Sequence, residues 1–171
     1  MRKCILTLLL LACMVLPAHA TTRIYLMRGL GELSPFSRLI TTLRAHGAIV
    51  TNWSWTNWRS VVADAYSHPH DRIVIAGHSM GDLKAFQASE ALYAKGRVSI
   101  TIGLDPLCTW PRATKGLEQY NILGNVCLPG DGKYHTVRGA HNIFIRGTGH
   151  IRYPTDPRVI KRVVQYAFPA Q

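Results

Sequence analysis

The residues best suited to chemistry are at positions 77–81, which read GHSMG and place a serine between two glycines. The preceding residues, 73–76, are mostly branched and apolar, and the residues that follow are rich in helix formers. A serine on a tight turn between a strand and a helix is the arrangement of a nucleophile elbow. We therefore predict that Ser79 is a nucleophile and that the backbone N–H of Met80 stabilises an oxyanion. The alternative is a chance match in an ordinary turn.

A serine nucleophile needs a base, and usually an acid that orients the base. Asp105 follows the next apolar run along the chain, so we expect it at the same edge of a parallel sheet as Ser79. The alternative for Asp105 is a turn residue before proline. His150 lies in a glycine-bearing loop before the last predicted helix and completes the chain order Ser, Asp, His. His141, at the start of a predicted strand, is the main rival base.

The elements that must position these residues alternate along the chain. We predict strands at residues 23–27, 48–52, 73–76, 98–103 and 142–146, and helices at residues 35–45, 57–67, 80–95 and 157–168. Such alternation is typical of a parallel sheet covered on both faces. Residues 107–138, rich in Pro, Gly and polar residues, are predicted to be a long loop or a small excursion from the sheet. The expected fold is α/β, a three-layer sandwich with a minimal, mainly parallel sheet of about five strands.

The first twenty residues have the pattern of a secretory signal peptide. Two cations precede an almost wholly apolar run over residues 5–16, and residues 18–20 form an A-x-A cleavage signal. The run is too short for a good membrane span. We therefore predict export of residues 21–171, as one domain without a transmembrane segment, to the periplasm or the medium. A lipoprotein acylated at Cys13 is the second-ranked alternative.

The cysteines that remain after this cleavage, Cys108 and Cys127, predict a disulfide. An even pair in an oxidising compartment favours a bond, which would contribute about 3 kcal/mol to stability if unstrained. Two free thiols are the alternative. The chain has no Cys-x-x-Cys spacing, so we predict no metal site, and a serine mechanism needs no cofactor.

The charge of the chain is strongly basic, with a formal net charge of +11 at pH 7. This balance suggests an anionic partner, such as an envelope polymer or phospholipid. The Lys and Arg residues are scattered rather than gathered in a short basic run, so we predict no nucleic-acid partner. Three tryptophans, Trp53, Trp55 and Trp58, either line an apolar acyl site or belong to the core.

Several stretches together resemble a known family. They are GHSMG at 77–81, LDP at 104–106, His150 followed by DPRV at 156–159, YLMRGL at 25–30 and WSW at 53–55. They look like the compact bacterial lipase- or thioesterase-like serine hydrolases of the α/β-hydrolase superfamily, and they cover most of residues 21–171.

This resemblance implies acyl transfer through Ser79, His150 and Asp105, with an acyl-enzyme that water hydrolyses. It also implies that the turn at Gly29 and Leu30 supplies a second oxyanion N–H. The first two strands of the family's sheet and any large lid are expected to be missing. An exported enzyme does not meet coenzyme A thioesters, so a carboxylic ester is the expected substrate. The rival function is a catalytically inactive protein of this fold that binds an anionic envelope component.

Overall fold

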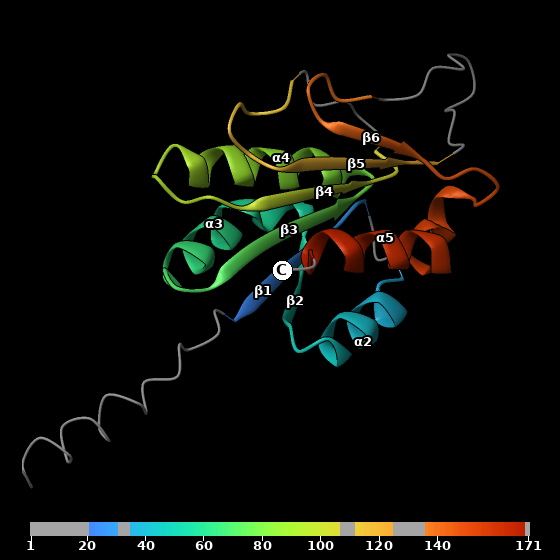
Figure 1. The fold of residues 1–171 in the computed structure, drawn as a ribbon, viewed down its shortest axis with the longest axis horizontal. Helices are drawn as coiled ribbons and strands as arrows, with labels where there is room; N and C mark the ends of the chain where they lie inside the picture. Colours follow the sequence, from blue (N-terminus) through green and yellow to red (C-terminus); the bar gives the residue numbers. More distant parts are fainter. Residues whose placement is uncertain (1–20, 31–34, 107–111, 125–135, 170–171) are drawn as a thin grey trace, which may run out of the picture.

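A single parallel sheet forms the centre of the molecule. The computed structural model describes residues 21–30, 35–106, 112–124 and 136–169 of the 171-residue chain. The sheet has six strands in the order β2-β1-β3-β4-β5-β6, and every neighbouring pair is parallel (Figure 1). The strands are β1 (Thr22–Arg28), β2 (Ile49–Ser54), β3 (Arg72–His78), β4 (Ile100–Leu104), β5 (Gln119–Leu123) and β6 (His141–Phe144).

Helices cover both faces of this sheet. They are α2 (Ser37–Ala45), α3 (Trp58–Tyr66), α4 (Met80–Tyr93) and α5 (Pro157–Ala167), with two 3₁₀ turns, η1 (Trp55–Asn57) and η2 (His150–Thr155). α2 and α5 contact each other on one face, and α3 and α4 contact each other on the other (Figure 1). The predicted three-layer α/β sandwich is therefore confirmed.

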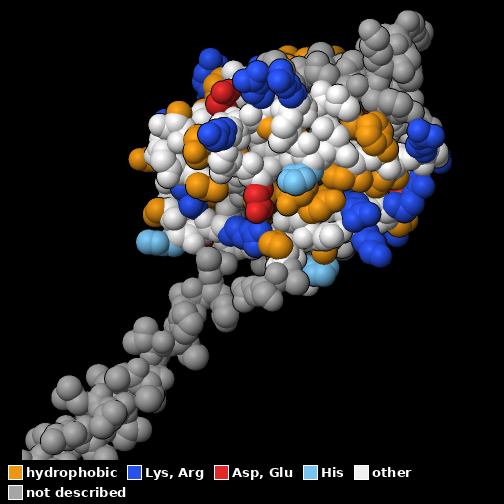
Figure 2. Space-filling model, turned by 45° about the horizontal axis from the view of Figure 1, so that its top comes forward, with side chains coloured by type: hydrophobic (Ala, Val, Ile, Leu, Met, Phe, Trp, Pro, Cys, Tyr) orange, Lys and Arg blue, Asp and Glu red, His pale blue; other side chains and the backbone are white. Residues whose placement is uncertain are grey.

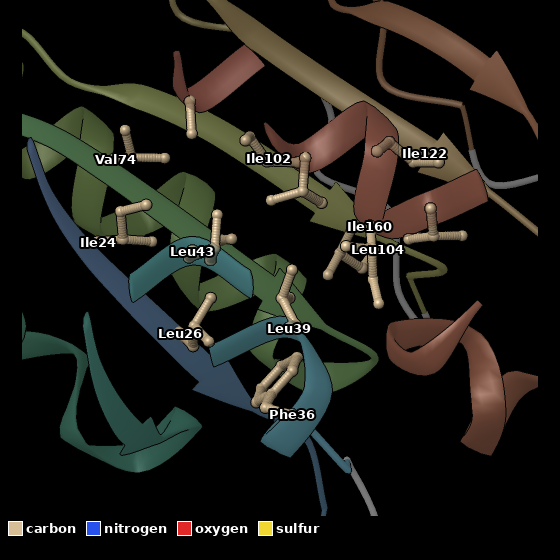
Figure 3. Packing of buried hydrophobic residues seen from close by; sticks show 14 of the residues in the cluster. Ile24, Leu26, Phe36, Leu39, Leu43, Val74, Ile102, Leu104, Ile122 and Ile160 are labelled. Atoms are coloured by element: carbon tan, nitrogen blue, oxygen red, sulfur yellow. The ribbon is translucent and has the colours of Figure 1, made fainter. Parts of the chain in front are cut away.

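The core has two halves, one on each face of the sheet. Ile24 and Leu26 of β1 pack with α2 and α5, whereas Tyr25 and Met27 of the same strand pack with α3 and α4. Figure 3 shows the first half, where strand residues such as Ile102 meet side chains of the two helices. Strands buried on both faces need nearly continuous apolar runs, which is why most of them could be predicted from the sequence.

The prediction of about five strands was one strand short, because β5 lies inside the segment predicted to be a loop. Its residues alternate in polarity, with Gln119 and Asn121 on the α4 side of the sheet and Ile122 on the other. Gln119 accepts a hydrogen bond from the backbone N–H of Thr114 and donates one to Thr101. These buried polar residues pair with loop backbone and with a neighbouring strand. They also remove the apolar run by which a strand is recognised.

Other predicted element boundaries need smaller corrections, and some predictions concern residues outside those that the structure describes. α2 begins at Ser37 rather than at residue 35, and α4 ends at Tyr93 rather than at residue 95. The predicted signal peptide (1–20) and both cysteines of the predicted disulfide, Cys108 and Cys127, lie outside the described residues. Within the described ranges, no helix combines the length and apolar character needed to cross a bilayer.

Candidate active site

Ser79 lies on the turn between β3 and α4, in a backbone conformation that few residues other than glycine adopt, with φ 60° and ψ −123°. Two glycines allow this turn. A Cβ at Gly77 would lie 2.1 Å from the carbonyl oxygen of Gly81, and a Cβ at Gly81 would lie 2.1 Å from that of Met27. The helix therefore sits directly against the sheet, and the strand–turn–helix geometry predicted for Ser79 is present.

Asp105 and His150 form a hydrogen-bonded pair at the same edge of the sheet. The His150 Nδ1 atom lies 2.8 Å from Oδ2 of Asp105, which directly follows β4 and is 3% exposed. The other carboxyl oxygen of Asp105 accepts a 2.8 Å hydrogen bond from the backbone N–H of Gly124. With the carboxylate accepting at Nδ1, neutral His150 carries its proton there, and Nε2 remains able to accept a proton.

The structure thus places Ser79, Asp105 and His150 at one edge, as the sequence predicts. The backbone N–H of Ser79 donates to the carbonyl oxygen of Leu104, which holds the serine beside the strand that carries Asp105. Between Ser79 and His150 themselves there is no side-chain hydrogen bond. Such a bond is often long before substrate binds.

His78 holds the backbone of His150, a role that the sequence analysis missed. Its Nε2 atom lies 2.9 Å from the carbonyl oxygen of His150, and the two rings are 4.6 Å apart. The side chain is only 2% exposed, and burial, together with the positive charge of protonated His150, lowers the pKa of His78 to about 4. His78 is therefore neutral near pH 7 and donates its Nε2–H to the carbonyl group. Nothing in the residue types alone distinguishes this role from packing in the turn.

The segment that carries His150 is anchored on both sides. Tyr153 and Pro154 of η2 are buried against the sheet. Asp156, which caps α5, accepts hydrogen bonds from the backbone and side chain of Arg158 and from the hydroxyl of Thr148. The hydrogen bonds from Arg158 lower the pKa of Asp156, so this anchor is charged at neutral pH.

The predicted oxyanion residues border Ser79. A Cβ at Gly29 would lie 2.7 Å from the Ser79 Cβ and 3.0 Å from its Oγ, so the backbone of Gly29 lies against the serine. Leu30 is the next residue, with a side chain that is 60% exposed. Met80 is the first residue of α4, where backbone N–H groups carry the positive end of the helix dipole.

We expect Gly29→Ala to lower kcat by about 10² to 10³-fold, because the added methyl group would displace either the serine or an oxyanion donor. Steady-state kinetics, with circular dichroism as a check on folding, would measure this effect. Gly149→Ala is the matched control, since its added Cβ meets nothing within 4 Å and its φ is −71°. An equal loss in both variants would contradict the proposed crowding at Ser79.

Asp82 is a fully buried carboxyl group beneath this edge. It lies in the first turn of α4, where its side-chain oxygens make no hydrogen bond to any described residue. A Cβ at Gly103 would lie 2.0 Å from Asp82 Oδ1, so that glycine makes room for the carboxyl group. Burial raises the pKa of Asp82 well above its usual range, and the negative charge of Asp105 raises it further.

We expect Asp82→Asn to stabilise the fold increasingly as the pH rises. The folded state holds a proton that the unfolded chain releases near pH 4, so the wild type loses up to about 1.4 kcal/mol of unfolding free energy per pH unit above that. Urea unfolding at pH 5 and pH 8 would measure the difference. Glu90→Gln, at an exposed position of the same helix, is the control for charge removal. A difference that does not change with pH would refute a protonated Asp82.

Two of the three tryptophans predicted either to line an acyl site or to belong to the core, Trp53 and Trp58, contact a core cluster. Trp53 and Trp58 are half-buried and pack against the core between the sheet and the α3–α4 pair. The guanidinium group of Arg59 lies 4.6 Å from the centre of the Trp58 ring. These contacts favour the core interpretation for Trp53 and Trp58.

The chain was compared with known proteins by sequence and by structure, and only its structure is similar to known ones. No family model and no curated protein sequence matches it. The structure is similar to that of human thioesterase 2, with a TM-score of 0.59 and 13% identity over 86% of this chain and 94% of that chain. It is also similar to a protein from Xanthomonas campestris pv. campestris described as a hydrolase of the α/β superfamily, with a TM-score of 0.55 and 12% identity over 84% and 98% of the two chains. The chain therefore has an α/β-hydrolase-like fold.

Proposed function

We propose that the protein is a serine hydrolase that cleaves carboxylic esters through a covalent acyl-enzyme. The observation that carries this proposal is the 2.8 Å pair of Asp105 and His150, held at the same edge as a serine on a strained elbow. A buried acid that orients a histidine beside a nucleophile is the geometry that activates a serine hydroxyl. The similarity of the fold to that of a thioesterase agrees with this chemistry.

In the proposed reaction, Nε2 of His150 takes the proton of the Ser79 hydroxyl as its oxygen attacks the ester carbonyl. The backbone N–H groups of Met80 and of the Gly29–Leu30 turn stabilise the oxyanion. The carbon–oxygen bond to the alcohol then breaks, and the alcohol leaves with the proton from His150. Water attacks the acyl-enzyme with His150 again as base, which releases the acid and regenerates Ser79. Neutral His78 adds no second positive charge beside the imidazolium that forms.

We also propose that residues 1–20 direct export and are removed, on the evidence of their sequence pattern. Outside the cytoplasm the enzyme would not meet coenzyme A thioesters. This is why we prefer oxygen esters to thioesters as substrates.

The experiment that tests the proposed function is labelling of the purified protein with a fluorophosphonate probe, followed by hydrolysis of aryl esters of increasing acyl length. Labelling identifies an activated serine, and the ester series measures the size of the acyl site. If the folded protein neither reacted with the probe nor hydrolysed any ester, the proposed hydrolase function would be refuted. The rival, a protein of this fold that binds an anionic envelope component without turnover, would then be favoured.

A further inference from the structure

The edge of the sheet that carries Ser79 also exposes large hydrophobic side chains. Leu30 follows β1 and is 60% exposed, Phe144 ends β6 and is 46% exposed, and Ile151 follows His150 and is 53% exposed. The carboxyl ends of parallel strands share one edge, so these three side chains lie at the same edge of the sheet as Ser79. Exposed hydrophobic residues beside an active site indicate a surface that meets something apolar.

Cations accompany these hydrophobic side chains. A hollow of about 530 Å³ between β6 and α5 is lined by Phe144 and four cationic residues, Arg146, Arg158, Lys161 and Arg162. From residue 136 to residue 169 the chain contains six Lys or Arg and a single acid, Asp156, which is bound to Arg158. Figure 2 shows Lys and Arg side chains gathered beside hydrophobic ones toward its right side, where the strands end in Figure 1.

The opposite edge of the sheet also carries cations. There Asp71 pairs with Arg23 at 2.8 Å, and Glu118 lines the same hollow as Arg72 and Arg97. Arg112, Lys115 and Arg138 line a further hollow at that edge, which no acid lines, so positive charge is not confined to the side of Ser79. The side that carries Ser79 combines its cations with Phe144, an exposed hydrophobic residue that lines the same hollow as Arg146, Lys161 and Arg162.

We propose that this edge docks on the surface of a bilayer that contains anionic phospholipids, and that the enzyme takes its ester substrate from that surface. We call it the docking rim, and it consists of Leu30, Phe144, Arg146, Ile151, Lys161 and Arg162. Hydrophobic side chains that enter the headgroup region and cations that attract anionic lipids are the two features that bind proteins to such surfaces. A soluble polyanion would use the cations but would gain nothing from the three hydrophobic side chains.

The geometry suits a lipid substrate. β3, which leads to Ser79, and β6, which leads to Arg146, are three strand spacings apart, or about 14 Å. A phospholipid headgroup in the hollow beside Arg146 would therefore leave the serine facing the same lipid surface. The choice of substrate rests on the proposed function, but docking itself does not depend on turnover.

The test uses purified Ser79→Ala protein, so that binding is measured without hydrolysis. Mass spectrometry first establishes that residues 1–20 are absent, so that they cannot cause any binding to vesicles. Sedimentation with phosphatidylcholine vesicles, with and without phosphatidylglycerol, then measures the affinity. We expect binding only to the anionic vesicles, and release by salt.

Charge variants locate the binding surface. Arg146→Gln, Lys161→Gln and Arg162→Gln together should weaken binding to anionic vesicles on the order of 100-fold. The matched control combines Lys95→Gln, Lys115→Gln and Arg138→Gln, which removes the same charge from exposed positions at the opposite edge. An equal loss in both triple variants would overturn the docking rim, because net charge alone would then explain the attraction.

Variants of hydrophobic residues distinguish a lipid surface from a soluble polyanion. Phe144→Ser combined with Ile151→Ser should also weaken vesicle binding, whereas Tyr66→Ser with Val98→Ser, exposed at the opposite edge, should not. Binding to heparin without any binding to vesicles would overturn the proposal in favour of a polyanion. Hydrolysis of a water-soluble aryl ester by the wild type, measured without vesicles, tests the proposed function separately.

Discussion

Ser79→Ala is expected to lower kcat on the order of 10⁶-fold, which would make it one of the two most damaging single substitutions in the chain. The hydroxyl oxygen of Ser79 is the atom that forms the acyl-enzyme, and no other described side chain can replace it at this turn. The folded state should survive, because alanine has the same backbone restrictions as serine at φ 60° and only one oxygen is removed. Initial rates with the best aryl ester, together with labelling by a fluorophosphonate, would measure the loss.

Ser60→Ala is the control for this substitution, since Ser60 is an exposed serine on α3. It should label and turn over as the wild type does. If Ser79→Ala retained either labelling or turnover while folded, the activated serine would have to be another residue. If it unfolded instead, Ser79→Gly, which fits a positive φ more easily, would separate the backbone from the hydroxyl.

The fold could be predicted from the sequence wherever burial on both faces leaves an apolar run. β1 and β3 are such strands, and each lies within the central part of the sheet. β5 could not be recognised, because Gln119 and Asn121 turn toward polar partners contributed by β4, β6 and a preceding loop. Those partners are distant in the sequence, and a pattern of local periodicity does not contain them.

Those site residues could be predicted whose positions follow from the order of the chain and from the ends of the strands. Asp105 could be placed at the edge beside Ser79 because it follows the next strand, and the structure brings His150 to it. The contacts that hold these residues were not predictable. The bond from His78 to the His150 backbone and the space that Gly103 leaves for Asp82 both join segments that only the folded sheet brings together.

Segments without periodic structure were the hardest to interpret. The η2 turn is fixed by the burial of Tyr153 and by the network of Thr148, Asp156 and Arg158. In the sequence these residues look like an ordinary loop with a helix start. The structure shows instead that the loop has a defined position, which is what a base needs if it is to act repeatedly on one serine.

His150→Ala should lower kcat about as much as Ser79→Ala does, because the base and the nucleophile act as one unit. For the same reason, the double variant Ser79→Ala/His150→Ala should be no slower than Ser79→Ala alone. Additive losses would mean that the two residues act independently, and the proposed proton transfer between them would be wrong. The pH dependence of kcat/KM in the wild type should report a single histidine, because His78 stays neutral well below pH 7.

His141→Ala is the matched control, since it removes the histidine that rivals His150 as the base. Its ring stacks on Tyr120 at 5.2 Å, at the start of β6, whereas Ser79 follows the end of β3. Because the strands are parallel, these positions lie at opposite edges of the sheet. We therefore expect His141→Ala to keep kcat within about threefold of the wild type, because it removes no group that stabilises the transition state. If His141→Ala lost turnover while His150→Ala retained it, His141 would be the base. The Asp105–His150 pair would then have only a structural role.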